Sequence, residues 1–170
     1  MIAIKLERSI YDYVKIEDVK NYLRVSHDID DEIIKLAIEA SCKFIHEYCN
    51  YILVQAIITF TVENYRRDLI GNNSLKTVYI PYRPATKLIK IITDDEIELE
   101  GKLKGDTIII YNNVFKCAVI VYKAGYDEIP ADLKMALFKI CADMYFNRTT
   151  QVQMNTDTLN ILNNYRLVNV

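Results

Sequence analysis

The sequence has little of what phosphate-binding loops and most catalytic motifs need: its 170 residues include only four glycines, three prolines and two histidines. The glycine-rich loops G-x-G-x-x-G and G-x-x-x-x-G-K-[ST], the nucleophile motif G-x-S-x-G and the zinc motif H-E-x-x-H are all absent from it. His27 and His46 lie far apart in the sequence, so a Ser-His-Asp triad has little support. We therefore expect neither an enzyme nor a bound cofactor.

Long apolar runs and an excess of one charge are also missing. No stretch of 18 or more apolar residues occurs, and the N-terminal segment carries charges too early for a secretory signal. The net charge of −2 offers no basic footprint for wrapping nucleic acid. The four cysteines form no C-x-x-C pair, which is typical of reduced thiols. We therefore expect a soluble cytoplasmic protein, and the length suits one domain with an appended arm.

Three segments have the pattern of α-helices, at residues 16–24, 30–49 and 131–147. The charged residues of segment 30–49 recur every four positions and predict its solvent-exposed stripe. Segment 131–147 is apolar on nearly every side, so we expect it to pack in the core while its outer edge contacts neighbouring subunits. The main buried face expected for segment 30–49 comprises Ile33, Leu36, Ala37, Ala40, Phe44 and Tyr48.

Residues 54–123 change to a period of two, which indicates half-buried strands. We expect an α+β fold in which this antiparallel β meander is inserted between the second and third helices of a small helical body. Residues 1–148 are expected to form a single domain, 149–158 a linker, and 159–170 a short helix or extended arm. The expected strands are 55–63, 77–81, 86–93, 96–99, 107–111 and 115–123, with turns at 71–74, 94–95, 101–106 and 112–113.

Two clusters of polar residues have the composition of metal sites. Cys42, His46 and Cys49 share one helix face at i, i+4 and i+7, and thiolate and imidazole both bind zinc. A second pair of ligands is missing, so buried structural residues are the interpretation that we favour. The acidic residues at 28–32 lack the glycine and distal glutamate of a calcium loop, and they stand where a helix begins, which favours a capping role.

The order of elements resembles the head–tail connector (adaptor) family of tailed bacteriophages and prophages. That family begins with a short helix ending in K-x-Y-L-R, an aspartate-rich turn and a long helix with spaced isoleucines and alanines. Ser41 stands where the family usually has a second alanine. The residues that match this opening are Lys20, Tyr22, Leu23, Arg24, Asp31, Ile34, Ile38, Ala40, Ile45 and Tyr48.

Three later stretches are similar to the same family. "YIPYRPATKLIKI" matches its proline corner before a strand, and "LNILNNYR" matches its closing L-L-x-x-Y-R. "VYKAGYDEIPADLKMALFKICADMYFNR" matches its strand, A-G-Y turn, proline and helix ending in Y-x-N-R. The structural motif residues of this last stretch are Gly125, Tyr126, Pro130, Tyr145, Asn147 and Arg148.

The resemblance implies a structural virion protein without catalysis. Such a protein forms a ring below the portal, twelvefold when it sits there, extends the DNA channel and offers a platform for a neck or tail protein. Its implied partners are copies of itself, the portal and a downstream neck or tail protein; DNA passes without sequence-specific binding, and no membrane is involved. Its implied location is the virion neck, reached through assembly in the host cytoplasm.

The C-terminal arm is the expected partner-binding segment, used in trans on the portal or a neighbouring subunit. Its expected contact residues are Leu159, Ile161, Leu162, Tyr165 and Arg166. Three alternatives stay open: an arm folded back on its own subunit, another neck component such as a head-completion or tail-terminator protein, and a metal-binding enzyme or sensor that uses Cys42, His46 and Cys49.

Overall fold

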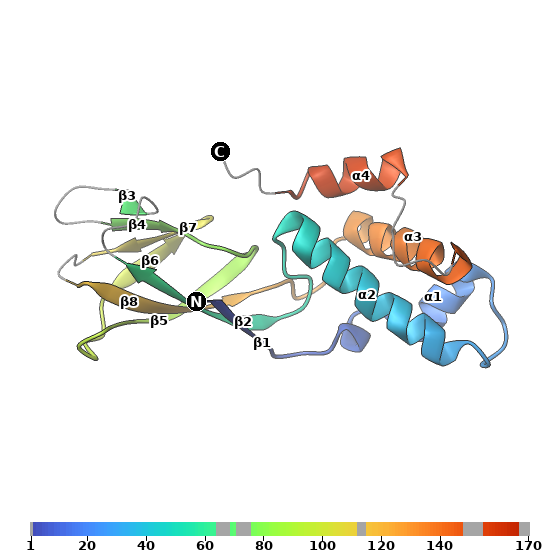
Figure 1. Ribbon diagram of the computed structural model, residues 1–170, viewed down its shortest axis with the longest axis horizontal. Coiled ribbons are helices and arrows are strands. Elements are labelled where there is room, and N and C mark those ends of the chain that lie inside the picture. The colour runs from blue at the N-terminus through green and yellow to red at the C-terminus, as the bar shows by residue number, and fades with distance from the viewer. Residues whose placement is uncertain (1, 64–68, 71–75, 112–114, 148–154, 167–170) are drawn as a thin grey trace. The chain divides into compact units, whose positions relative to one another are not determined.

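The computed structural model describes residues 2–63, 69–70, 76–111, 115–147 and 155–166 (Figure 1). The described chain has an α+β fold in which antiparallel strands lie between the second and third helices, as the sequence predicted. It divides into two compact units: a β unit of residues 1–7 and 55–126, and a helical unit of residues 8–54 and 127–170. None of the described helices is long and apolar enough to cross a membrane.

The helical unit contains α1 (Ile16–Leu23), α2 (Asp31–Cys49), α3 (Ala131–Asn147) and α4 (Thr156–Asn163), and a short 3₁₀ helix, η1 (Ile10–Asp12). The three predicted helices are confirmed to within one residue at either end. Ser9 begins η1 with a capping box, and the Tyr11 hydroxyl donates a hydrogen bond of 2.8 Å to Glu39 Oε1 of α2. The helices enclose an apolar core that includes the fully buried Val19, Ile34, Ile38, Leu133, Leu137 and Ile140.

The buried face of α2 differs from the face that the sequence pattern predicted. Ile33 and Leu36 are 48% and 66% exposed, and Ala40 is exposed as well, so their assignment to the core was wrong. The reason is that α2 has apolar residues on two faces. Packing against α1 and α3 buries the face whose residues follow the predicted ones by one position in the sequence. The face that is buried consists of Ile34, Ala37, Ile38, Ser41, Ile45 and Cys49.

The β unit contains two antiparallel four-stranded sheets, one in the order β1-β2-β8-β5 and the other in the order β3-β4-β7-β6. In β2 the buried residues alternate with half-buried ones, as the period of two predicted. β8 pairs with β2 over its whole length and with β5 on its other side. The strands are β1 (Ile2–Leu6), β2 (Ala56–Glu63), β3 (Leu69–Ile70), β4 (Lys76–Tyr79), β5 (Ala85–Thr93), β6 (Gly101–Lys104), β7 (Thr107–Ile110) and β8 (Cys117–Ala124).

Two segments of the β unit depart from the predicted pattern. Residues 101–104, expected in a turn, form strand β6, and the turn follows at Gly105, whose φ of 55° suits glycine. Residues 96–99, expected as a strand, contribute only an isolated bridge from Glu98 to Ile92, because Glu96 adopts a positive φ of 60°. The N-terminal strand β1 was not predicted, and the turns expected at 71–74 and 112–113 lie outside the described residues.

The proline corner, residues 81–84, is hydrogen-bonded to β8 within the β unit. The buried Tyr122 hydroxyl donates to the Tyr82 carbonyl at 2.9 Å and accepts from the Tyr82 amide at 3.2 Å, and burial raises the pKa of this phenol. Just after β8, the Gly125 amide donates to the Pro84 carbonyl at 3.0 Å. Gly125 has a φ of 101°, a conformation that L side chains rarely adopt, so this turn requires glycine.

Candidate functional site

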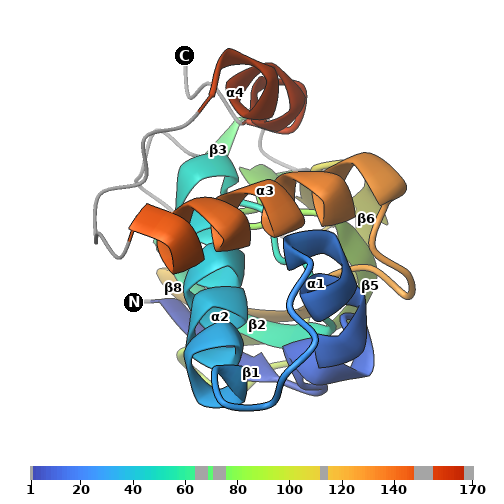
Figure 2. The same cartoon turned by 90° about the vertical axis from the view of Figure 1, so that its right-hand side faces the viewer.

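The C-terminal segment lies against the helical unit of its own chain, where α4 packs on α2 and α3 (Figures 1 and 2). Asn155 begins α4 with a side-chain cap to the Asp157 amide. Leu162 is fully buried, and its carbonyl accepts a hydrogen bond from the buried Cys49 thiol at 3.5 Å. Leu159 and Ile161, the other predicted apolar contact residues, are half-buried.

Polar and aromatic contacts hold the residues that follow α4. The Tyr165 hydroxyl donates to the Asp132 carboxylate, whose oxygens lie 2.9 and 2.8 Å away, and the Tyr165 ring meets Tyr51 edge-on. Burial, followed by the Asp132 carboxylate, raises the pKa of Tyr165 to about 12. The Arg166 guanidinium lies 4.9 Å from the centre of the Tyr48 ring, which gives a cation–π contact.

The family-motif residues near α1 and α2 build the turn that joins these helices. Leu23 is buried, and the Tyr22 ring packs on Phe138 of α3 with the ring centres 5.6 Å apart. Arg24 ends α1 with a φ of 59°, the left-handed conformation common after a helix. Lys20 donates to Asp31 at 2.7 Å and also binds Asp28, which raises the pKa of Lys20.

Asp30 occupies the N-cap position of α2, as expected for the acidic cluster, but its side chain makes no capping hydrogen bond. Instead, the Asp30 carboxylate accepts from the Tyr145 hydroxyl of α3 at 2.5 Å. This contact gives the motif residue Tyr145 a role in joining the beginning of α2 to the end of α3. Pro130 precedes α3 and its carbonyl accepts the Lys134 amide, whereas Arg148 lies outside the described residues.

Cys42, His46 and Cys49 do not form a ligand set with one another or with their neighbours. Within the described part of the chain, no three His, Cys, Asp or Glu side chains come close enough to share a metal ion. Burial raises the pKa of both thiols to about 11 and lowers the pKa of His46, so the cysteines stay protonated at neutral pH. Cys49 is buried and contacts α4 through the Leu162 carbonyl, whereas Cys42 and His46 are half-buried.

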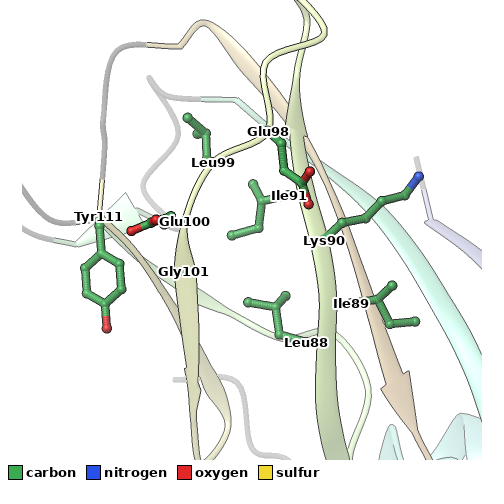
Figure 3. Close-up of a pocket in the computed structure, with 9 residues that line it drawn as sticks. All are labelled: Leu88, Ile89, Lys90, Ile91, Glu98, Leu99, Glu100, Gly101 and Tyr111. Atoms are coloured by element: carbon green, nitrogen blue, oxygen red, sulfur yellow. The ribbon is translucent and has the colours of Figure 1, made fainter.

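The β unit has an open groove of about 580 Å³ beside β5 (Figure 3). Figure 3 shows Leu88 and Ile91 in the space between β5 and the segment of Gly101, while Lys90 points away from it. A Cβ atom on Gly101 would lie 2.9 Å from the Ile109 carbonyl oxygen of β7 and 2.5 Å from Ile91 Cδ1 of β5, so this position favours glycine. The lining is mixed: the apolar side chains of β5 and Leu99 alternate with the charged residues Lys90, Glu98 and Glu100.

The exposed apolar side chains of α2 are a surface feature that the sequence analysis missed. Ile29 just before α2 is 87% exposed, and Ile33 and Leu36 follow on one face of the helix. On α3, Met135 and Phe146 are 43% and 64% exposed. The spacing of these residues was visible in the sequence, but their exposure depends on which side of each helix the rest of the unit covers.

Comparison with known proteins places this fold among phage neck proteins. The family model described as head completion protein matches residues 12–168, whereas no curated protein matches the chain. A chain in the neck of an empty gene transfer agent (GTA) particle, computed with C6 symmetry, has a TM-score of 0.76 at 15% identity, over 99% of this chain and 97% of that chain. A chain in the neck of a native GTA particle, computed with C12 symmetry, has a TM-score of 0.73 at 14% identity, over 99% and 97%.

A chain in the virion of a native GTA particle has a TM-score of 0.72 at 14% identity, over 98% of this chain and 96% of that chain. At identities of 14–15% these structures show only that the fold is shared, whereas the match to the family model shows which family the chain belongs to. The match spans both the helical unit and the β unit and is consistent with the head–tail connector family that the motifs indicated; head completion, the description of the matching model, was among the alternatives left open. The chain belongs to the head completion protein family.

Proposed function

We propose that this protein is a structural subunit of the phage neck that assembles as a ring below the portal. The observation that carries the proposal is the family match over residues 12–168, which includes the helices α1 to α4 and all described strands but β1. The fold shared with chains of GTA necks over nearly their full length supports it. The C6 and C12 symmetries used for those necks support a cyclic arrangement, which we extend to a twelvefold ring here.

The ring extends the DNA channel of the portal and presents a platform for the next neck or tail protein. A net charge of −2 suits a channel through which DNA slides without sequence-specific binding. Subunits gather in the host cytoplasm during assembly and end in the neck of the virion. This role is structural, and we assign it no catalytic residue.

The C-terminal segment supplies part of the contact with the portal or the neighbouring subunit. Of the predicted contact residues, Leu159 and Ile161 are half-buried and Arg166 is exposed, so these three stay accessible to a partner. Leu162 and Tyr165, by contrast, fasten the segment to its own subunit through the contacts with Cys49 and Asp132. The segment thus has a side that holds it in place and a side that meets a partner.

Electron microscopy of the purified protein mixed with its portal tests this function. We expect class averages to show an added ring at the narrow end of the portal, with the portal's rotational symmetry. The same mixture without the protein is the control. Portal particles that gain no density, at protein concentrations well above those of the portal, would contradict the proposal. Density on the tail tube in place of the portal would favour a tail-terminator role.

A further inference from the structure

One side of α2 and the turn before it presents an apolar stripe to solvent. Ile33, Leu36 and Ala40 follow one another on α2 at intervals of three and four residues, which places them on one helix face, and Ile29 lies in the turn just before the helix. Ile29 is 87% exposed, Ile33 48% and Leu36 66%, so the helical unit leaves this face uncovered. We call these four residues the α2 stripe.

A second stripe of the same length runs along α3. Met135, Lys139, Ala142 and Phe146 follow one another at intervals of four, three and four residues, and Met135 and Phe146 at its ends are exposed. Each stripe spans 11 residues of chain, and the α3 stripe is about 16 Å long on its helix. We call these four residues the α3 stripe.

The two stripes lie on different surfaces of the helical unit. The side chains of Ser41 and Met144 meet where α2 packs on α3, with Ser41 Oγ 3.8 Å from Met144 Sδ. At about 100° per residue, the α2 stripe lies about 110° around its helix from Ser41, and the α3 stripe about 170° around its helix from Met144. Both stripes therefore face away from the contact between the two helices, and neither can cover the other within one subunit.

We propose that the α2 stripe of one subunit packs against the α3 stripe of the next subunit in the ring. This proposal rests on the proposed function and names the surfaces through which the ring closes. A ring needs a heterologous contact, in which one surface of each subunit meets a different surface of its neighbour. Two unlike apolar stripes on one chain meet this need, whereas a stripe that paired with its own copy would stop at a dimer.

Length and charge match the two stripes to each other. Both have apolar ends and equal spans, so side chains of one helix can fill the spaces of the other. Lys139 stands within the α3 stripe, and no carboxylate pairs with it in the described part of the chain. The α2 stripe is bordered by the exposed carboxylates of Glu32 and Glu39. Glu32 pairs with Lys35 at 2.7 Å, whereas Glu39 accepts from the neutral Tyr11 hydroxyl and keeps a negative charge that this ammonium group can meet across the contact.

Photo-cross-linking on the assembled portal ring tests the contact directly. A benzoyl-phenylalanine replaces Leu36, and ¹⁴N-labelled and ¹⁵N-labelled subunits are mixed before they join the portal. We expect mixed-isotope cross-links from position 36 to peptides of residues 131–147. Ile97 on the β unit, 58% exposed, is the matched control position and should give no cross-link to those peptides. Cross-links from position 36 to the portal or to α2 of another copy would overturn the proposal.

Substitutions that charge each stripe give an independent measurement. We expect Ile33→Asp with Leu36→Asp, and separately Met135→Asp with Phe146→Asp, to keep the circular dichroism of the wild type and to lose ring formation on the portal at least tenfold. Ile97→Asp should leave ring formation unchanged. Complete rings from wild type and from both variants would refute the stripe contact while the neck function stands. Wild type that forms no ring would instead refute the neck function.

Discussion

At the residue scale, Tyr165 shows how single contacts hold the C-terminal segment on the helical unit. Its hydroxyl donates to both oxygens of Asp132, and its ring meets Tyr51. Tyr165→Phe removes the hydrogen bond and keeps the ring. We expect the free energy of unfolding at pH 8 to fall by about 1 kcal/mol, the usual net contribution of an intramolecular hydrogen bond. Urea unfolding followed by circular dichroism measures the change.

The same tyrosine makes this difference depend on pH. The pKa of Tyr165 is raised to about 12 in the folded state, mainly by burial and then by Asp132, against about 10 in an unfolded chain. Below pH 10 both states keep the proton and the contact contributes fully; between pH 10 and 12 the unfolded state loses the proton first, so stability falls. The difference in unfolding free energy between wild type and Tyr165→Phe should therefore become smaller between pH 10 and pH 12. A difference that stays constant to pH 12 would contradict this assignment.

At the scale of the element, α2 offers two neighbouring isoleucines with opposite surroundings. Ile34 is fully buried and Ile33 is 48% exposed. Ile34→Ala removes buried methyl groups and leaves a cavity, which we expect to cost about 3 kcal/mol of unfolding free energy. Ile33→Ala should change it by no more than about 0.5 kcal/mol, since it lies on the surface. Thermal and urea unfolding of the two variants measure both values. Equal losses of unfolding free energy would contradict the assignment of Ile34 to the buried face of α2 and of Ile33 to its exposed face.

The adjacent isoleucines also explain what the sequence could and could not predict about α2. Its ends were predictable, because aspartates precede it and Asn50 follows it in the left-handed conformation. Its buried face was not predictable from the pattern of apolar residues, since two faces are apolar. The family spacing of isoleucines at 34, 38 and 45 did mark the buried side. A family pattern records tertiary packing that the local pattern of one chain leaves open.

The strands and the exposed stripes also divide into features that a local sequence pattern predicts and features that depend on tertiary packing. Alternation in β2 predicted its buried face, because a strand half-covered by a core has a period of two. β6 escaped prediction because it holds only four residues, two of them lysines, next to glycines typical of a turn. The contact of Tyr165 with Asp132 joins residues 33 positions apart and leaves no local signal. Exposure of the α2 and α3 stripes likewise depends on the packing of the whole unit.

At the scale of the whole molecule, the C-terminal segment is the part whose removal separates folding from assembly. Deleting residues 156–170 leaves α1, α2 and α3 and the β unit, so we expect a folded chain with a loss of unfolding free energy on the order of a few kcal/mol, because the site of Leu162 is uncovered. The truncated chain should no longer join portal-bearing capsids, since it lacks the partner-facing side of the segment. Co-sedimentation with such capsids measures the attachment, and circular dichroism reports the fold.

A double substitution in α4 distinguishes loss of the contact with the portal from loss of folding stability in the truncated chain. Leu159→Asp with Ile161→Asp charges the half-buried residues of α4 and keeps Leu162 and Tyr165, which fasten it to the subunit. We expect this variant to fold and to co-sediment at least tenfold less than wild type, whereas Asn160→Asp, at an exposed position of the same helix, should attach normally. Full attachment of both the truncated chain and the double variant would show that the ring binds the portal through other surfaces. If the truncated chain fails to attach while the double variant attaches normally, α4 acts within its own subunit. Attachment would then depend on Leu162 and Tyr165, which hold α4 in place, and not on Leu159 and Ile161.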